Sequence, residues 1–317
     1  ILFMVSRLGR SYRQHRPDTT ARVFEAIRQA QPARLYIAAD GPREGRAGET
    51  DLCEQTRKVA LEVDWPCQVT TLLRNENLGC KKAVSNAINW FFEHEPEGII
   101  LEDDCLPARD FFRFCDELLE KYRDDPRVGS ITGDNFISAT WKPDESYYFS
   151  RFSHIWGWAT WRRAWANYDV TMADWPSLGS RFIKTEVFAG NTHAAAYWSA
   201  VFEKVHKGEI DTWDYQWVFA CLKNNWLSCI PRENLVTNIG FGPNATHTKS
   251  AESKLANVAT GSLDFPLLEP KDIQSVQEAD LWTLNEVFEV HQHGLSLKRL
   301  KASLNYRFGR LINKWSK

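Results

Sequence analysis

The sequence predicts an α/β protein with a mostly parallel sheet flanked by helices. Up to residue 132, short apolar runs alternate with stretches whose apolar residues recur every three or four positions. Alternation at this spacing is typical of strand–helix–strand units, in which the strands are parallel and helices cover both faces of the sheet. With 317 residues, of which 43% are hydrophobic, the chain can bury a full core.

Strands and helices can be assigned along this first stretch of the chain. The pattern predicts strands over residues 1–5, 35–39, 69–73, 99–101 and 128–132. Helices are predicted between them, where a helical spacing of apolar residues begins near Pro17, Glu49, Ala83 and Phe111. The turn Asp40-Gly41-Pro42 ends the second strand.

The pattern changes after residue 135. Residues 141–165 are rich in aromatic side chains, 182–206 look helical, 211–217 begin a further helix, and 228–231 form a short strand. No low-complexity linker or internal repeat interrupts the chain. We therefore predict a main domain over 1–262, with halves at 1–135 and 136–262, and a helical C-terminal extension over 263–317.

Three consecutive carboxylates, Glu102, Asp103 and Asp104, follow the predicted strand at 99–101. Adjacent carboxylates repel one another, so they favour the binding of a cation. Carboxylates suit hard divalent ions such as Mg²⁺ or Mn²⁺, which proteins commonly bind together with substrate phosphates. The alternative is a solvated acidic turn.

Polar side chains from other strands are expected at the same edge of the sheet. Arg7, Asp40 and Asn77 each follow a predicted strand, as do Asp103 and Asp104. In open α/β sheets, ligands bind beyond the carboxyl ends of the strands. The sequence therefore predicts a polar ligand site at this edge. Arg7 in a surface ion pair remains an alternative.

The composition excludes several function classes. The net charge of -2 gives no field that would attract nucleic acid. The seven Cys include no Cys-x-x-Cys pair, which disfavours a zinc site and indicates a reducing, cytoplasmic compartment. A dinucleotide-binding dehydrogenase needs a Gly-x-Gly-x-x-Gly loop after a strand, and no such loop is present. The 14 Trp suit the stacking of flat or sugar-like ligands.

Several short stretches, taken in order, resemble the GT-A glycosyltransferases. The similarity is to bacterial enzymes of the family 2-like or hemolysin-like type and to the Golgi N-acetylglucosaminyltransferase that initiates complex N-glycans. It covers about residues 1–250. The matching stretches are Asp40-Gly41, Asn77-Leu78-Gly79, Leu101-Glu102-Asp103-Asp104 with Phe111-Phe112, Trp156-Gly157-Trp158, Trp213-Asp214 and Gly240 to His247.

This resemblance implies a nucleotide-diphosphate sugar donor and a divalent metal, Mn²⁺ or Mg²⁺. The first half of the main domain would bind the donor and the second half the acceptor. The metal would be bound by Asp104, with His247 beside it or beside the diphosphate; an exposed loop histidine is the alternative. Donor-binding roles would fall to Arg7, Asp40, Asn77, Gly79, Lys82, Glu102 and Asp103. For Lys82, a solvated helix face is an equal alternative.

The resemblance also implies an acceptor site and a general base. The base of the family lies on a Trp-Asp segment, which corresponds to Asp214. Because this chain has one Asp after Trp213 where the Golgi enzyme has two, Asp211 is a second candidate. A helix N-cap is the structural alternative for Asp214. We assign the floor of the acceptor site to Trp156, Gly157 and Trp158, since a glycine between two Trp allows close approach.

The glycine-rich segment 240–244 could fold over the donor. Residues 291–317 contain seven basic and no acidic residues, with apolar residues at three- and four-residue steps. This pattern favours an amphipathic helix on an anionic membrane surface, which would place the chain at the inner face of the membrane; packing on the main domain is the alternative.

The leading hypothesis is thus an inverting, metal-dependent glycosyltransferase that acts on a glycan or lipid-linked acceptor. A non-catalytic nucleotide-sugar-binding or scaffold protein is the second. A sugar nucleotidyltransferase is the third, although the loop at residues 6–10 is poor in glycine for a phosphate loop.

Overall fold

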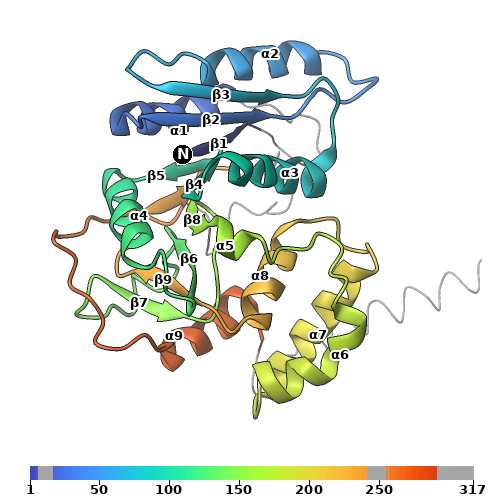
Figure 1. The fold of residues 1–317 in the computed structure, drawn as a ribbon, viewed down its shortest axis with the longest axis vertical. Coiled ribbons are helices and arrows are strands. Elements are labelled where there is room, and N and C mark those ends of the chain that lie inside the picture. Colours follow the sequence, from blue (N-terminus) through green and yellow to red (C-terminus); the bar gives the residue numbers. More distant parts are fainter. Residues whose placement is uncertain (6–16, 241–254, 256, 291–317) are drawn as a thin grey trace, which may run out of the picture.

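A computed structural model describes residues 1–5, 17–240, 255 and 257–290. They form an α/β structure built on an eight-stranded sheet with helices on its faces (Figure 1). The α/β class with a large central sheet flanked by helices is therefore confirmed.

The elements are as follows. The strands are β1 (Leu2–Val5), β2 (Arg34–Ala39), β3 (Gln68–Leu73), β4 (Glu97–Glu102), β5 (Cys105–Pro107), β6 (Val128–Thr132), β7 (Tyr147–Ser150), β8 (Trp158–Trp161), β9 (Leu227–Pro231) and β10 (Val236–Asn238). The α-helices are α1 (Pro17–Ala30), α2 (Glu49–Ala60), α3 (Gly79–His94), α4 (Arg109–Lys121), α5 (Arg162–Trp165), α6 (Trp175–Phe182), α7 (Thr192–His206), α8 (Asp214–Lys223) and α9 (Gln277–Trp282). Two π-helical turns, η1 (Ile183–Val187) and η2 (Thr283–Val287), follow α6 and α9.

The large sheet has the strand order β3-β2-β1-β4-β8-β6-β9-β7. Strands β3, β2, β1 and β4 pair in parallel, and β6 pairs in parallel with β9. Strands β8 and β7 run in the opposite direction, since β8 is antiparallel to β4 and β6, and β7 is antiparallel to β9. The sheet is therefore mixed, where the alternation of elements had predicted mainly parallel pairing.

Each face of the sheet carries its own core because successive side chains of a strand point to opposite faces. In β1, Phe3 and Val5 pack with α1 and α4, whereas Leu2 and Met4 pack with α3 and α8. All four β1 residues are buried, which is why this strand is a continuous apolar run in the sequence.

The second half of the chain extends the sheet and adds a helical layer. The segment 182–206, which was predicted to be helical, contains η1 and α7. Asn191 is the N-cap of α7, and its side chain accepts from the Ala194 amide at 3.0 Å. Helices α6 and α7 enclose a third core with the end of α9–η2.

The start of the predicted extension packs on the same body. Leu263 is buried in the core on the α1 and α4 face, and Ser275 forms a β-bridge with Phe149 of β7. Asp280 of α9 accepts a hydrogen bond from the Ser150 hydroxyl at 2.6 Å. No helix among the described residues has the length and apolar character needed to cross a membrane.

Candidate functional site

The carboxyl ends of several strands meet at one edge of the large sheet. Strands β1, β2, β3 and β4 are parallel neighbours, so the residues that follow them lie along the same edge. Strand β6 also ends there, and β8 begins there, since Thr132 lies opposite Trp158. Most of the residues that the sequence singled out are found along this edge.

The acidic segment lies at the end of β4. Glu102 is the last residue of the strand and is half-buried, as is Asp104, whereas Asp103 is only 2% exposed. The Thr20 hydroxyl of α1 donates to Asp103 Oδ2 at 3.3 Å, so this carboxylate binds α1 to the sheet. Within the described residues, no three His, Cys, Asp or Glu side chains form a group able to hold a metal ion on their own.

Asp104 lies against the end of a small two-stranded sheet formed by β5 and β10. The Ile239 amide donates to the Asp104 carbonyl at 2.8 Å, and the Gly240 amide donates to Asn238 Oδ1 at 2.8 Å. A Cβ atom at Gly240 would lie 2.0 Å from Asp104 Oδ2. Any larger residue at position 240 would therefore displace this carboxylate.

Carboxylates from four separate segments converge around Cys80 in the first turn of α3. The pKa of this thiol is raised, first by burial and then by the charges of Glu102, Asp214, Asp211 and Asp40. Asp104 and Glu102 likewise raise the pKa of the buried Cys105 thiol, after burial itself. The structure thus brings together the acidic segment and both candidate bases, which are more than 100 residues apart in the sequence.

Asp214 is the first residue of α8, and its carboxylate has two hydrogen-bond donors. The Thr212 hydroxyl and the Tyr215 amide both donate to Oδ1, the amide at 2.9 Å. Among the described residues, none donates a hydrogen bond to Oδ2. The residue does not cap the helix in the usual way, because Oδ1 accepts from the adjacent amide rather than one two or three residues on. Asp211 is exposed.

Asp40 connects the end of β2 to the loop before α3. It is 1% exposed, and the Leu78 amide donates to both its oxygens at 3.1 Å. Burial raises the pKa of this carboxyl, while the hydrogen bond from Leu78 lowers it. Asn77 secures the same loop, since its side chain donates to the Gly41 carbonyl at 3.0 Å and accepts from the Gly79 amide at 3.2 Å.

Gly79 has a φ of 73°, in the left-handed region that favours glycine, which explains why this residue type begins α3. Lys82 is exposed on the same helix, and the structure gives it no contact that sets it apart from a solvated side chain.

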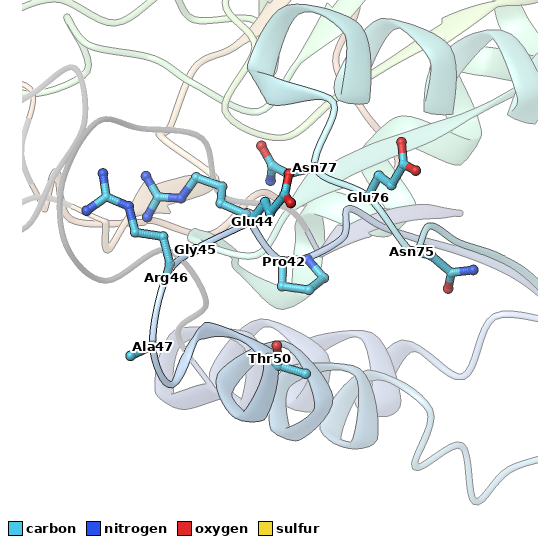
Figure 2. A pocket seen from close by; sticks show the side chains of 10 residues that line it. Pro42, Glu44, Gly45, Arg46, Ala47, Thr50, Asn75, Glu76 and Asn77 are labelled. Carbon is cyan, nitrogen blue, oxygen red and sulfur yellow. The ribbon is translucent and has the colours of Figure 1, made fainter.

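An open pocket lies beside this loop. Its volume is about 840 Å³, and it is lined by Pro42, Arg43, Glu44, Gly45, Arg46, Ala47, Thr50, Asn75, Glu76 and Asn77. Figure 2 shows the loop after β2 on one side of the pocket and the loop after β3 on the other. Arg43 is held in place by the buried Glu49, with a guanidinium–carboxylate distance of 3.0 Å. The pocket arginines had no signal in the sequence, because no strand end or motif marks them.

The segment Trp156-Gly157-Trp158 was predicted to form the floor of an acceptor site, but the Trp158 side chain is buried in the core. Trp158 is 1% exposed, and its ring packs on Trp213 at 6.0 Å and Trp217 at 5.3 Å. Its side chain therefore supports the segment that carries Asp214, and our assignment of this ring to an acceptor surface is corrected. Trp156 is half-buried, and its ring meets the Phe136 ring edge-on at 5.3 Å.

Gly157 has a φ of 80°, and a Cβ atom there would lie 2.8 Å from a Val236 methyl group. The close approach that this glycine permits is therefore to a protein side chain, not to an open surface.

One buried carboxyl at the site was missed. Asp134 follows β6 and is fully buried; its Oδ2 accepts from the Trp156 amide at 3.0 Å, while its Oδ1 has no hydrogen-bond partner. Burial raises the pKa of this carboxyl well above its usual range, which favours the neutral acid. The rule that polar residues follow strands would have pointed to it, since 128–132 was predicted as a strand.

Four of the sequence-predicted elements lie outside the described residues: Arg7, His247, residues 241–244 of the glycine-rich segment, and the basic segment 291–317. Their predicted roles stay predictions.

A scan against protein-family models finds no match, and a search of curated proteins finds none either. Among solved structures, the chain is similar to HddC from Yersinia pseudotuberculosis, with 10% sequence identity and a TM-score of 0.31. The similarity covers 51% of this chain and 76% of that chain. A likeness this weak does not bear on function.

Proposed function

We propose that the chain is a metal-dependent, inverting glycosyltransferase of the GT-A type. It would transfer a sugar from a nucleotide-diphosphate donor to a hydroxyl group of a glycan or lipid-linked acceptor. One observation carries this proposal. Four carboxylates from separate segments lie near the Cys80 thiol, at the carboxyl edge of the sheet, and their charges add to the effect of burial in raising its pKa: Glu102, Asp214, Asp211 and Asp40. Ligands of open α/β sheets bind at this edge.

The donor side of the proposal rests on the acidic segment and the neighbouring pocket. The described residues offer a divalent ion no complete protein cage, yet Asp104 presents a half-buried carboxylate at a strand end. Mg²⁺ and Mn²⁺ commonly bind through one or two carboxylates together with substrate phosphates. The residues therefore fit an ion that binds with the diphosphate, which it would neutralise as a Lewis acid.

The nucleoside would occupy the pocket between the loops after β2 and β3, which is large enough for a ligand of that size. Asp40 contributes by fixing one of these loops through the Leu78 amide. Asn77 ties the two loops together through the Gly41 carbonyl. Both residues would thus shape the donor pocket through the backbone.

The acceptor side rests on Asp214. The Thr212 hydroxyl and the Tyr215 amide hold its Oδ1, so the carboxylate has a defined orientation. Its Oδ2 would accept the proton of the acceptor hydroxyl as that oxygen attacks the anomeric carbon. The bond from the anomeric carbon to the diphosphate breaks on the opposite face of the sugar, which inverts the configuration.

The test is a hydrolysis screen with UDP-glucose, UDP-N-acetylglucosamine, GDP-mannose and dTDP-rhamnose, each with and without Mn²⁺. The proposal predicts Mn²⁺-dependent release of a nucleoside diphosphate from at least one donor, and its loss in Asp104→Ala. Nucleotide binding without release would favour the non-catalytic sugar-nucleotide-binding protein. Release of a nucleoside monophosphate or of pyrophosphate would favour a nucleotidyltransferase. Neither binding nor release would reject the whole class.

A further inference from the structure

Tyr168 contacts the backbone directly before Asp214. Its hydroxyl donates to the Trp213 carbonyl at 3.1 Å, from the loop that follows α5. Trp213 is the N-cap residue of α8 and is buried, so this contact reaches the first turn of the helix that carries Asp214. A second hydrogen bond supports the same turn, since the Gln216 side chain donates to the Thr212 carbonyl at 2.8 Å.

The Tyr168 ring is anchored to α3 through Trp165. It stacks on the Trp165 ring with a centroid distance of 4.1 Å and an interplanar angle of 10°. The Trp165 indole donates to the Asn89 side chain of α3 at 2.7 Å. Because both rings are held by α3, the Tyr168 hydroxyl has little freedom to move relative to that helix.

The Tyr168 hydroxyl also lies close enough to Asp214 and Cys80 to be affected by their charges. Its pKa is raised, first by burial and then by the charges of Asp214 and Cys80. The hydroxyl therefore remains a neutral donor to the Trp213 carbonyl over the whole range in which enzymes are assayed. Nothing in the sequence marked this tyrosine, since its contact depends on how α5, α3 and α8 pack.

We propose that Tyr168 is a positioning residue that fixes the Trp213–Asp214 turn relative to α3, and so sets the position of the Asp214 carboxylate at the site. This rests on the proposed function only where it assigns a reaction to Asp214. Tyr168 would act through the Trp213 carbonyl and would not itself contact the substrate. Its loss should therefore affect turnover more than donor binding.

The test is Tyr168→Phe, which keeps the ring and its stacking on Trp165 and removes only the hydroxyl. Tyr147→Phe is the matched control. Tyr147 is a buried tyrosine of β7, and its hydroxyl pairs with the Tyr122 hydroxyl at 2.6 Å, at the opposite end of the sheet from β3. Each variant loses one hydroxyl that has a hydrogen-bond partner, half-buried in Tyr168 and buried in Tyr147. A purely structural role would give them similar effects.

The first readout is hydrolysis of the nucleotide sugar that the wild type cleaves in the screen, with Mn²⁺ present. In Tyr168→Phe, kcat should fall about tenfold while KM for the donor stays within about twofold, because a small misplacement of a reacting group costs rate and not donor affinity. Tyr147→Phe should keep both values. Equal kinetics of Tyr168→Phe and Tyr147→Phe would overturn the proposal.

The second readout does not depend on activity. Asp214 raises the pKa of the half-buried Cys80 thiol, so an Asp214 that moves away should make this thiol more reactive. We expect alkylation of Cys80 by iodoacetamide, resolved by peptide mass spectrometry with Cys67 as the reference, to rise about threefold in Tyr168→Phe but not in Tyr147→Phe. Unchanged Cys80 alkylation in Tyr168→Phe would also overturn the proposal. If the wild type cleaves no donor, the proposed function fails and this comparison still decides the role of Tyr168.

Discussion

Gly240→Ala tests the role of Asp104 without changing any candidate ligand. The added Cβ would lie 2.0 Å from Asp104 Oδ2, 2.7 Å from its Cγ and 2.9 Å from Asn238 Oδ1. An ordinary contact between such atoms is 3.4–4 Å, so the Asp104 carboxylate must move by more than about 1 Å. Metal–ligand distances tolerate only about 0.2 Å. The substitution should therefore displace the carboxylate from a bound ion.

The expected loss follows from comparable changes around metal ligands. Changes of groups that orient a ligand cost about 10- to 100-fold in metal affinity, or about 1.4–2.7 kcal/mol. We expect Gly240→Ala to weaken Mn²⁺-dependent binding of the nucleoside diphosphate by that factor. Isothermal titration with UDP, GDP and dTDP, each with Mn²⁺, measures this.

Gly190→Ala is the control for the loss of a glycine. Gly190 has a φ of 84° with nothing within 4 Å of an added Cβ, so the change should cost about 1 kcal/mol of stability and leave binding unchanged. Thermal melts of both variants show whether the fold is retained. If folded Gly240→Ala binds the nucleotide and Mn²⁺ as tightly as the wild type, Asp104 is not the ligand.

Three further predictions concern other groups. Asp214→Asn should lower turnover by about 10²- to 10⁴-fold with little change in donor affinity, whereas the same loss in Asp211→Asn would place the base three residues earlier. Burial raises the pKa of Asp280 from its ordinary 3.8 to about 6, so the folded state binds its proton more tightly and stability is lost as the pH rises through this range. Relative to Asp280→Asn, the unfolding free energy of the wild type should thus fall by about 2 kcal/mol between pH 4 and pH 7 in urea titrations, and a flat difference would contradict the assignment. The full chain should sediment with anionic liposomes at low salt and a chain that ends at residue 294 should not; equal sedimentation would reject a membrane role for 291–317.

The first half of the fold was predictable because most of its strands are buried on both faces; β3, at the edge of the sheet, is the exception. Segments such as Leu2–Val5 and Ile99–Leu101 are unbroken apolar runs between amphipathic helices, so their type and order follow from the pattern alone. The reversed strands were not predictable in this way. Trp158–Trp161 has only four residues, and its direction depends on pairing with β4 and β6 rather than on any local signal.

In the candidate site, too, the positions of residues at strand ends could be predicted, whereas their contacts could not. The strand-end rule predicted that Asp40 and the acidic segment would lie along one edge, and they do. The partners of these groups depend on packing between distant segments. Asp40 accepts a hydrogen bond from the Leu78 amide, and Gly240 lies close to Asp104. No local sequence pattern predicts either contact. Trp158 was misassigned for this reason, because its burial comes from α8 packing over β8.

The most direct test of the account is whether Asp104 binds the divalent ion of a nucleotide donor. Electron paramagnetic resonance reports free Mn²⁺ as protein is added in the presence of UDP, GDP or dTDP. We predict that one of these nucleotides causes the wild type to take up about one Mn²⁺ per chain, and that Asp104→Ala takes up none above the nucleotide alone. Equal uptake by both proteins, or no uptake by the wild type with any nucleotide, would contradict the assignment of Asp104 and with it the proposed metal-dependent transfer.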